Sequence, residues 1–400
     1  MSLVKSVQHT FLAASQAPSR YMNARARVWK NKLAAAMYGA TKKRLASMII
    51  VAFGANCFFV LVLYTKAHEQ VMTFIRAQTH QLQLLEHASQ GLTEQHAVPG
   101  FRQFPIPLQA PRQVTCSDRP AHLLGAMNVS FVKTPQSLEA IEKSNPNVEL
   151  GGQFHPSDCI PSQKVAIIVP FRHRDEHLKH WLYYLHPILQ RQRVEYGVYI
   201  VNQFGEGVFN RAKLMNIGYV EALKDAPYDC FIFSDVDLVP MDDRNLYRCY
   251  DNPRHFSVAV DKFNFSLPYK ECFGGVSGLT KKQFEKINGF PNNYWGWGGE
   301  DDDIYNRIRK VGMNISRPDM TIGRYRMIRH NRDAHNENNP FRSWQITKTA
   351  FTMWRDGINT LEYKLIKAER WPLYTKVIVE VGKRSPGNQV WAHRNKRQGH

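Results

Sequence analysis

The chain has 400 residues, enough for two or three domains or for one large domain with extensions. Its net charge of +19 is uneven, because the first 44 residues hold nine of the 53 lysines and arginines and no acidic residue, which leaves +10 for the rest. The charge therefore does not indicate a nucleic-acid-binding protein, and no binding module of that class is visible.

An apolar run from Leu45 to Tyr64 directly follows the basic segment 1–44. About 20 residues at a rise of 1.5 Å match a hydrocarbon core of roughly 30 Å, so the run predicts a single transmembrane anchor. The positive-inside rule then predicts a cytoplasmic tail and a luminal or extracellular bulk. A cleaved signal peptide is the alternative, but the run is longer than a signal-peptide core and starts far from Met1.

Three further segments follow the anchor. Residues 65–114 predict a helical stem and a proline-rich linker, and the stem hints at a homodimer formed through the stem or the anchor. Residues 115–385 are expected to form the folded domain, and the basic residues 386–400 a disordered tail.

Cysteines and glycosylation sequons agree with a secretory compartment. Outside the anchor five cysteines remain, an odd number that suggests two disulfides and one free thiol, and their spacing does not suggest zinc. Three sequons begin at Asn128, Asn264 and Asn314.

Strands and helices alternate in the first half of the folded domain. Apolar runs predict strands at Lys164–Pro170, at Tyr196–Asn202 and from Cys230. Helical patterns lie between them, the second with Asn210 as its expected cap. This order predicts an α/β fold with right-handed crossovers and a mainly parallel sheet.

Charged residues gather where these strands are expected to end. Arg172, Arg174 and Arg211 stand at positions from which a guanidinium can meet a phosphate. Asp235 and Asp237 close the third strand, and such a pair suits a divalent cation that bridges a carboxylate and a diphosphate. Ligands of α/β sheets bind at this edge.

The second half of the domain is rich in glycine, tryptophan and acids. Residues 273–279 contain three glycines, which let backbone approach a ligand closely. In residues 289–307, Trp295 and Trp297 precede four consecutive acids. Aromatic rings beside carboxylates suit the binding of a sugar. A loop rich in glycine and tryptophan is also a candidate for a mobile lid. Asp302 and Asp303 also fit the first turn of a helix. Spacing alone makes Met327 a core residue and leaves His330 undecided between core and metal.

Six motifs in this order resemble the β-1,4-galactosyltransferases (glycosyltransferase family 7), Golgi enzymes with a GT-A glycosyltransferase fold. The matching stretches are residues 165–172, 209–213, 233–237, 273–277, 295–303 and 327–330. The resemblance spans about residues 115–385, and the preceding residues match only in their layout of tail, anchor and stem.

The resemblance implies a role for each matching residue. The expected Mn²⁺ ligands are Asp237, Met327 and His330. UDP is expected at Pro170, Phe171, Arg172, Arg174, Phe209, Arg211, Val236 and Lys262. The sugar sites are expected at Asp235, Gly275, Trp297, Glu300 and Asp301, with Asp301 as the catalytic base. The acceptor's N-acetyl pocket is expected to include Arg342 and Ile346. The implied disulfides are Cys116–Cys159 and Cys230–Cys249, which leaves Cys272 free.

The implied activity is Mn²⁺-dependent, inverting transfer of Gal or GalNAc from a UDP-sugar to the 4-hydroxyl of a terminal GlcNAc, or a related sugar, on a glycoprotein or glycolipid glycan. Cys272 stands where galactose-selective members carry Tyr, and its smaller side chain predicts use of UDP-GalNAc, with UDP-GlcNAc still open. Ser343 departs from the aromatic residue of many vertebrate members, as in an invertebrate-type member. The alternative from another class is a non-catalytic, lectin-like homologue, which would have lost the base or a metal ligand.

Overall fold

A computed structural model describes residues 114–331 and 333–384. The predicted cytoplasmic tail, anchor and C-terminal tail, and nearly all of the stem, lie outside the described residues. Among the residues described, no helix is long and apolar enough to cross a bilayer.

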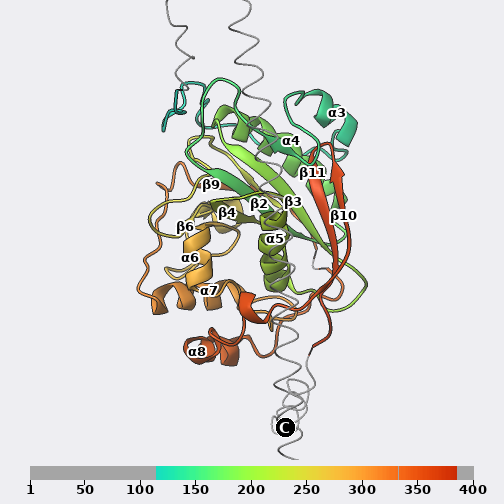
Figure 1. Cartoon of the computed structure of the whole chain (residues 1–400), viewed down its shortest axis with the longest axis vertical. Coiled ribbons are helices and arrows are strands. Elements are labelled where there is room, and N and C mark those ends of the chain that lie inside the picture. Colours follow the sequence, from blue (N-terminus) through green and yellow to red (C-terminus); the bar gives the residue numbers. More distant parts are fainter. Residues whose placement is uncertain (1–113, 332, 385–400) are drawn as a thin grey trace, which may run out of the picture. The chain divides into compact units, whose positions relative to one another are not determined.

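One mixed sheet organises the described residues (Figure 1). Its strands run in the order β10-β11-β3-β2-β4-β8-β6, and β1 pairs with β3. Their bounds are β1 (Gln153–Phe154), β2 (Lys164–Phe171), β3 (Glu195–Gln203), β4 (Cys230–Ser234), β6 (Arg254–His255), β8 (Val276–Thr280), β10 (Lys364–Trp371) and β11 (Tyr374–Glu380). The expected parallel arrangement holds at the centre, where β11, β3, β2 and β4 are parallel. The flanking strands β10, β8 and β1 pair antiparallel, so the sheet is mixed rather than mainly parallel.

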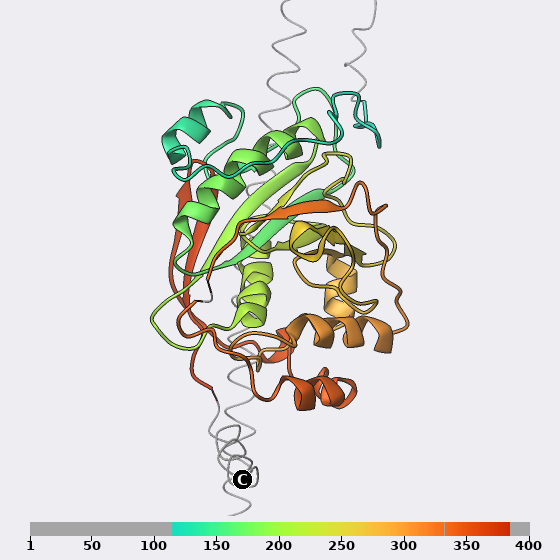
Figure 2. The same cartoon turned by 180° about the vertical axis from the view of Figure 1, so that it is seen from behind.

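Helices cover both faces of the sheet (Figures 1 and 2). Side chains alternate along β2: Val165, Ile167 and Val169 belong to the core around α4 (Asp175–Arg191). Ala166 and Ile168 belong to the core around α5 (Arg211–Asp225). Because β2 is buried on both faces, its side chains are apolar without interruption, as the sequence shows. The expected cap of α5 is confirmed, since Asn210 Oδ1 accepts a hydrogen bond from the Lys213 amide at 2.9 Å.

The second half of the chain adds short helices and a small sheet. The helices are α3 (Leu138–Lys143), α6 (Lys281–Lys286), α7 (Glu300–Lys310) and α8 (Arg342–Thr352), with 3-10 turns η1 (Asp261–Phe263) and η2 (Ile358–Thr360). The small sheet has the order β5 (Leu238–Pro240), β9 (Arg324–Met327) and β7 (Ala259–Val260). Because Leu238 pairs with Met327, this sheet brings the residues after β4 beside a segment almost 90 residues later.

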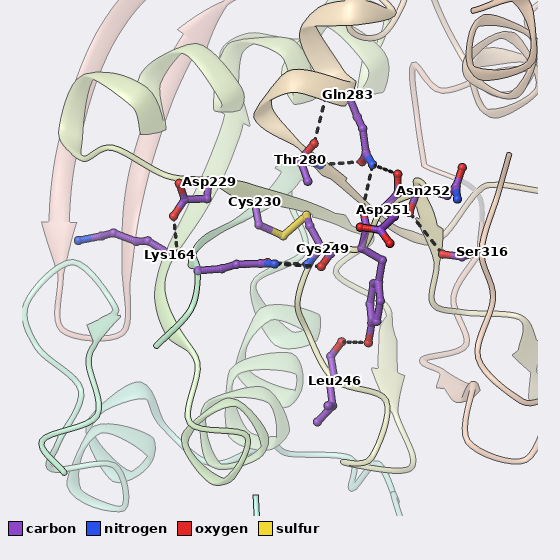
Figure 3. The surroundings of a disulfide bond; sticks show 12 residues. Lys164, Asp229, Cys230, Leu246, Cys249, Asp251, Asn252, Thr280, Gln283 and Ser316 are labelled. Atoms are coloured by element: carbon purple, nitrogen blue, oxygen red, sulfur yellow. Dashed lines mark hydrogen bonds between the residues drawn. A yellow bond between two sulfur atoms is a disulfide. The ribbon is translucent and has the colours of Figure 1, made fainter. Parts of the chain in front are cut away.

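Both implied disulfides are present, and Cys272 is the free cysteine of the described residues. Cys230, the first residue of β4, is bonded to Cys249 (Figure 3). Gln283 Nε2 donates to the carbonyls of Tyr250 and Asp251, so the loop beyond Cys249 is also tied to α6. The start of β4 is therefore held firmly, and the end of the same strand leads to Asp235.

Candidate active site

The end of β4 presents Asp235 at the surface of the sheet edge. The Asp235 amide donates to the carbonyl of Gly275 at 3.1 Å, which joins β4 to the turn before β8. Gly275 has φ of +79°, and a Cβ there would lie 2.6 Å from Ser257 Oγ. Only glycine fits this position without strain, so the predicted glycine stretch shapes the edge on which Asp235 lies.

Arg211, in the first turn of α5, lies among three acids. Its Nε donates to Asp235 Oδ1 at 2.7 Å, and its Nη1 donates to Asp301 Oδ1 at 2.8 Å and to Glu300 Oε1 at 3.3 Å. Only 16% of its side-chain surface is exposed. Residues expected to bind UDP and sugar therefore form one cluster, which we call the Arg211 cluster (Arg211, Asp235, Glu300 and Asp301).

Burial and charge work against each other in the Arg211 cluster. Burial raises the pKa of Glu300 to about 7, with Asp301 adding to the rise and Arg211 opposing it. Burial likewise raises the pKa of Asp235 to about 6 against the effect of Arg211, although 31% of the Asp235 side chain is still exposed. Burial alone would lower the pKa of Arg211, but the surrounding carboxylates raise it. Arg211 thus stays charged and offsets part of the repulsion among the acids.

The four consecutive acids form the first turn of α7 and have separate partners. Gly274 lies so close to Asp301 that a Cβ there would be 2.4 Å from Asp301 Oδ2. Asp302 accepts a hydrogen bond from Tyr269 at 2.9 Å. Asp303 is buried and binds Arg307 Nε at 2.6 Å. The expected position of Asp302 and Asp303 in the first turn of a helix is confirmed. The Asp303 carboxylate is occupied by its contact with Arg307.

Asp237 and His330 form a second polar pair next to the Arg211 cluster. His330 Nε2 donates to Asp237 Oδ2 at 3.1 Å, and the Ile328 amide donates to the Asp237 carbonyl at 2.8 Å. The hydrogen bond to Asp237 raises the pKa of His330, and burial of the ring opposes this rise. Met327 is the last residue of β9 and packs, partly buried, against the core.

The Asp237 carboxylate and the His330 imidazole thus meet at one place, and both groups suit a Mn²⁺ ion. His330 Nδ1 lies 2.7 Å from the Asn331 carbonyl. When Nδ1 carries the proton and donates it there, the Nε2 lone pair is available to a metal. The described residues contain no group of three His, Cys, Asp or Glu side chains that would bind a metal. The resident side chains therefore fit a metal only if Met327 or a ligand oxygen completes the set.

Three residues near this pair were not predicted from the sequence. The His177 ring on α4 lies 5.3 Å from the His330 ring, and its buried Nδ1 has no partner among the described residues. Asp333 forms an ion pair with Arg174, and Arg174 Nη2 lies 2.8 Å from His330 Nδ1. Asp261 accepts a hydrogen bond from the Met327 amide at 2.9 Å. No local motif marks these residues, because their contacts join distant segments.

The remaining residues expected to bind UDP differ in their surroundings. Pro170, Phe171 and Val236 are buried near the strand ends. Arg172 is buried, donates to the Gly207 carbonyl at 2.6 Å and lies 5.0 Å from the Phe209 ring. Lys262 is exposed in η1, with its ammonium 5.8 Å from the Phe263 ring.

The Trp-Gly segment before α7 is tied to the segment before α8. Trp295 is buried, whereas 52% of Trp297 is exposed. The Trp297 amide donates to the Glu337 carbonyl at 2.8 Å, and the Asn339 amide donates to the Trp297 carbonyl at 2.9 Å. Arg342 begins α8 with its guanidinium 5.6 Å from the Trp297 ring. Ile346 lies one turn later and accepts from Asn306 of α7 at 3.4 Å.

Cys272 lies close to the Arg211 cluster. Its amide donates to the Tyr269 carbonyl at 3.1 Å, and Arg317 donates to its carbonyl at 3.0 Å. Burial raises the pKa of the Cys272 thiol, and the charges of Asp301 and Asp302 add to the rise.

Comparison with known proteins gives matches to two family models. The models are the N-terminal region of glycosyl transferase group 7, over residues 116–250, and the N-terminal domain of galactosyltransferase, over residues 254–331. β-1,4-Galactosyltransferase 2 of Cricetulus griseus is 50% identical over 362 residues, which cover 87% of this chain and 97% of that protein. β-1,4-Galactosyltransferase 2 of Homo sapiens is 61% identical over 267 residues, 66% of this chain and 72% of that protein. The solved catalytic domain of Drosophila β-1,4-galactosyltransferase 7 with xylobiose is 29% identical, with a TM-score of 0.47, and covers 55% of this chain and 93% of that chain.

Proposed function

Because the chain belongs to glycosyl transferase group 7, the family of the β-1,4-galactosyltransferases, we propose that it is an inverting, Mn²⁺-dependent hexosyltransferase. It moves Gal or GalNAc from the UDP-sugar to the 4-hydroxyl of a terminal GlcNAc, or a related sugar, on a glycan. The observation that most supports this proposal is the Arg211 cluster, in which Arg211 binds Asp235, Glu300 and Asp301 beside the Asp237–His330 pair.

Asp301 acts as the general base. Its carboxylate takes the proton of the acceptor 4-hydroxyl while that oxygen forms a bond to the sugar's anomeric carbon. The bond from this carbon to UDP breaks at the same time, and UDP leaves with the electron pair. A single displacement converts the α-linked donor into a β-linked product. Arg211 contacts Asp301 and so orients its side chain for this step.

Polar atoms without partners suit the hydroxyls of a sugar. Glu300 Oε2 is buried and has no hydrogen-bond partner in the described part of the chain, and Trp295 Nε1 is in the same state. Buried polar groups of this kind are costly unless a ligand satisfies them. We assign Glu300 to a sugar hydroxyl, with the exposed Trp297 ring as a surface on which the sugar packs.

Asp237 and His330, which contact each other, would hold the metal, with Met327 as the third ligand that the family resemblance implies. When bound, Mn²⁺ neutralises charge on the departing diphosphate. The chain's own contribution is to hold UDP. The residues assigned to this role are Arg172, Arg174, Phe209 and Lys262, together with the buried Pro170, Phe171 and Val236.

The donor preference depends on Cys272. Galactose-selective relatives carry Tyr at this position, which is larger than Cys. The smaller Cys272 side chain would leave room for a 2-acetamido group near Asp301. Appreciable use of UDP-GalNAc follows from this volume difference. Arg342 and Ile346 line the acceptor side, where the N-acetyl group of GlcNAc binds.

The cellular setting follows from the sequence. A GT-A catalytic domain would lie in the Golgi lumen, tethered by a single-pass anchor at residues 45–64 with its basic tail in the cytoplasm.

A matrix of donors and acceptors tests the proposal. UDP-Gal, UDP-GalNAc and UDP-GlcNAc are each assayed with Mn²⁺ against terminal GlcNAc and glucose acceptors, with product linkage read by NMR. A β-1,4-linked product with UDP-Gal or UDP-GalNAc is expected. Glycan binding without turnover by any donor would favour the lectin-like alternative.

Asp301→Asn is the matched variant for the same assay, with Asp302→Asn as its control. We expect Asp301→Asn to lower kcat by roughly 100-fold or more while UDP binding persists, because general-base catalysis is lost but the nucleotide site is intact. Full activity of Asp301→Asn would remove this residue from the base role.

A further inference from the structure

Strand β10 is an open edge of the large sheet (Figure 1). In the residues described it pairs on one side only, with β11. Seven of its eight residues are exposed, and Leu365, Ile366 and Trp371 each leave about two fifths of their surface in solvent. The pairing with β11 is regular from Lys367 to Trp371 and shifts at a bulge between Leu365 and Lys367. The regular part of the exposed edge presents unpaired backbone N–H and C=O groups and invites another strand.

The hairpin between β10 and β11 decides which backbone groups face outward. Two residues, Pro372 and Leu373, connect the strands, and Trp371 stands opposite Tyr374. The pair that flanks a two-residue loop exchanges backbone hydrogen bonds, and bonded and non-bonded pairs then alternate. Lys367 and Glu369 therefore direct their backbone groups towards β11. Ala368 directs its backbone N–H and C=O towards the open edge.

A second copy of β10 can bond to this edge in antiparallel orientation about a two-fold axis. Charges decide the register. With the axis at Ala368, Lys367 of each copy faces Glu369 of the other. With the axis at Lys367, two lysines face each other, and with the axis at Glu369, two glutamates do. Like charges directly opposite destabilise a strand pair, so Ala368 is the favoured centre.

The charges within one copy support the same register. Lys367 Nζ lies 2.5 Å from Glu369 Oε1 of its own strand, so both side chains lie on one face. Pairing about Ala368 would join two such pairs into a group of four alternating charges.

We propose that β10 is a dimerisation edge, at which two copies of this chain pair antiparallel about Ala368. The sheet order separates this edge from the site, because β10 stands at one end of the sheet and β8 and β6 at the other. The dimer therefore leaves the Arg211 cluster accessible in both copies. This interface is distinct from a dimer formed through the stem or the anchor.

Position-specific cross-linking of the full chain tests the register. The two Ala368 Cα atoms would lie about 5.5 Å apart, within the range of a disulfide. The two Lys364 residues would be roughly 27 Å apart, since four strand residues separate each from the axis. Ala368→Cys is expected to form a covalent dimer under mild oxidation, and Lys364→Cys is not. Equal cross-linking of both variants, or none with Ala368→Cys, would overturn the proposal.

Charge reversal separates contacts between copies from contacts within one copy. In the Ala368→Cys background, Lys367→Glu and Glu369→Lys are each expected to lose most of the covalent dimer. A mixture of the two variants should recover it as a heterodimer, because each Glu then faces a Lys of the other copy. The charge pair inside each chain stays broken in the mixture, so recovery can come only from contacts between copies.

Thermal unfolding of each charge variant shows whether the monomer is still folded. Folded single variants that cross-link as well as the parent, or a mixture that recovers nothing, would refute the pairing. A dimer that sediments unchanged in all variants while Ala368→Cys fails to cross-link would assign association to another part of the chain.

Discussion

Arg211 and Asp301 are 90 residues apart in the chain, yet Arg211 Nη1 donates to Asp301 Oδ1 across 2.8 Å. The position of Arg211 is set by the capped start of α5, and that of Asp301 by the first turn of α7. The same guanidinium binds Asp235 at the end of β4. One cation therefore joins the three elements that carry the proposed base and sugar contacts.

Removing the Arg211 guanidinium should damage both stability and activity. In Arg211→Ala three crowded carboxylates lose their shared cation, and we expect the free energy of unfolding to fall by roughly 3 kcal/mol or more. Activity should fall by about 100-fold or more, because Asp301 loses the contact that orients it. Urea unfolding and steady-state kinetics measure the two effects.

Asp158→Asn is the control for this variant, since it breaks an exposed ion pair with Arg193. Such a surface pair should contribute only about 0–1 kcal/mol. An Arg211→Ala protein as stable and active as the Asp158→Asn protein would show that the cluster is not held by Arg211.

Loss of a ligand from the Asp237–His330 pair should weaken metal binding. Asp237→Asn and His330→Gln each remove one donor, and we expect the Mn²⁺ dissociation constant to rise by about 10-fold or more. Titration of free Mn²⁺ by electron paramagnetic resonance measures this directly, without an activity assay. Glu206→Gln, at an exposed carboxylate paired with His173, should bind Mn²⁺ like the parent. Unchanged affinity in both ligand variants would place the metal elsewhere.

The side chain at position 272 should control donor choice. Cys272→Tyr adds a ring beside Asp301 and Asp302, where the 2-acetamido group of a donor would have to fit. We expect the ratio of initial rates with UDP-GalNAc and UDP-Gal to fall by about 10-fold or more. Cys272→Ser keeps the volume small and should preserve the parent ratio. A strong preference of the parent for UDP-Gal, or an unchanged ratio in Cys272→Tyr, would contradict the volume argument.

His186 should make the fold sensitive to acid. It is fully buried, with Nε2 donating to the Leu373 carbonyl at 3.0 Å and Nδ1 accepting from the Tyr196 hydroxyl at 2.7 Å. Burial lowers the pKa of His186 from 6.5 to about 4. The unfolded chain therefore binds a proton that the folded chain does not, and stability falls as the pH drops from about 6.5 to about 4.

The expected contribution of His186 to this loss is roughly 3 kcal/mol, from a difference of about 2.5 pKa units. Urea unfolding at pH 7 and pH 4.5 measures it. His186→Gln should show a smaller difference between the two pH values than the parent, whereas His155→Gln, at an exposed histidine, should match the parent. Equal pH dependence in the His186→Gln and parent proteins would refute the assignment.

Local patterns in the sequence were sufficient for the central elements. The apolar runs at β2, β3 and β4 were recognisable because strands buried on both faces need continuous apolar side chains. The cap at Asn210 was predictable because capping involves residues three positions apart. The strands β8, β10 and β11 were not predicted, and the antiparallel pairing of β8 with β4 and of β10 with β11 makes the sheet mixed.

The sequence by itself determined the residue types that carry the chemistry: the carboxylates after β4, the acids that open α7 and the Met327–His330 segment. Only the tertiary structure decided how these groups combine. It brought Arg211 among Asp235, Glu300 and Asp301, and His330 against Asp237, and it added His177 and Asp333 beside them. The physical reason is distance: a capping or burial pattern acts within a few residues. These ion pairs instead join segments that meet only when the strands align at one edge of the sheet.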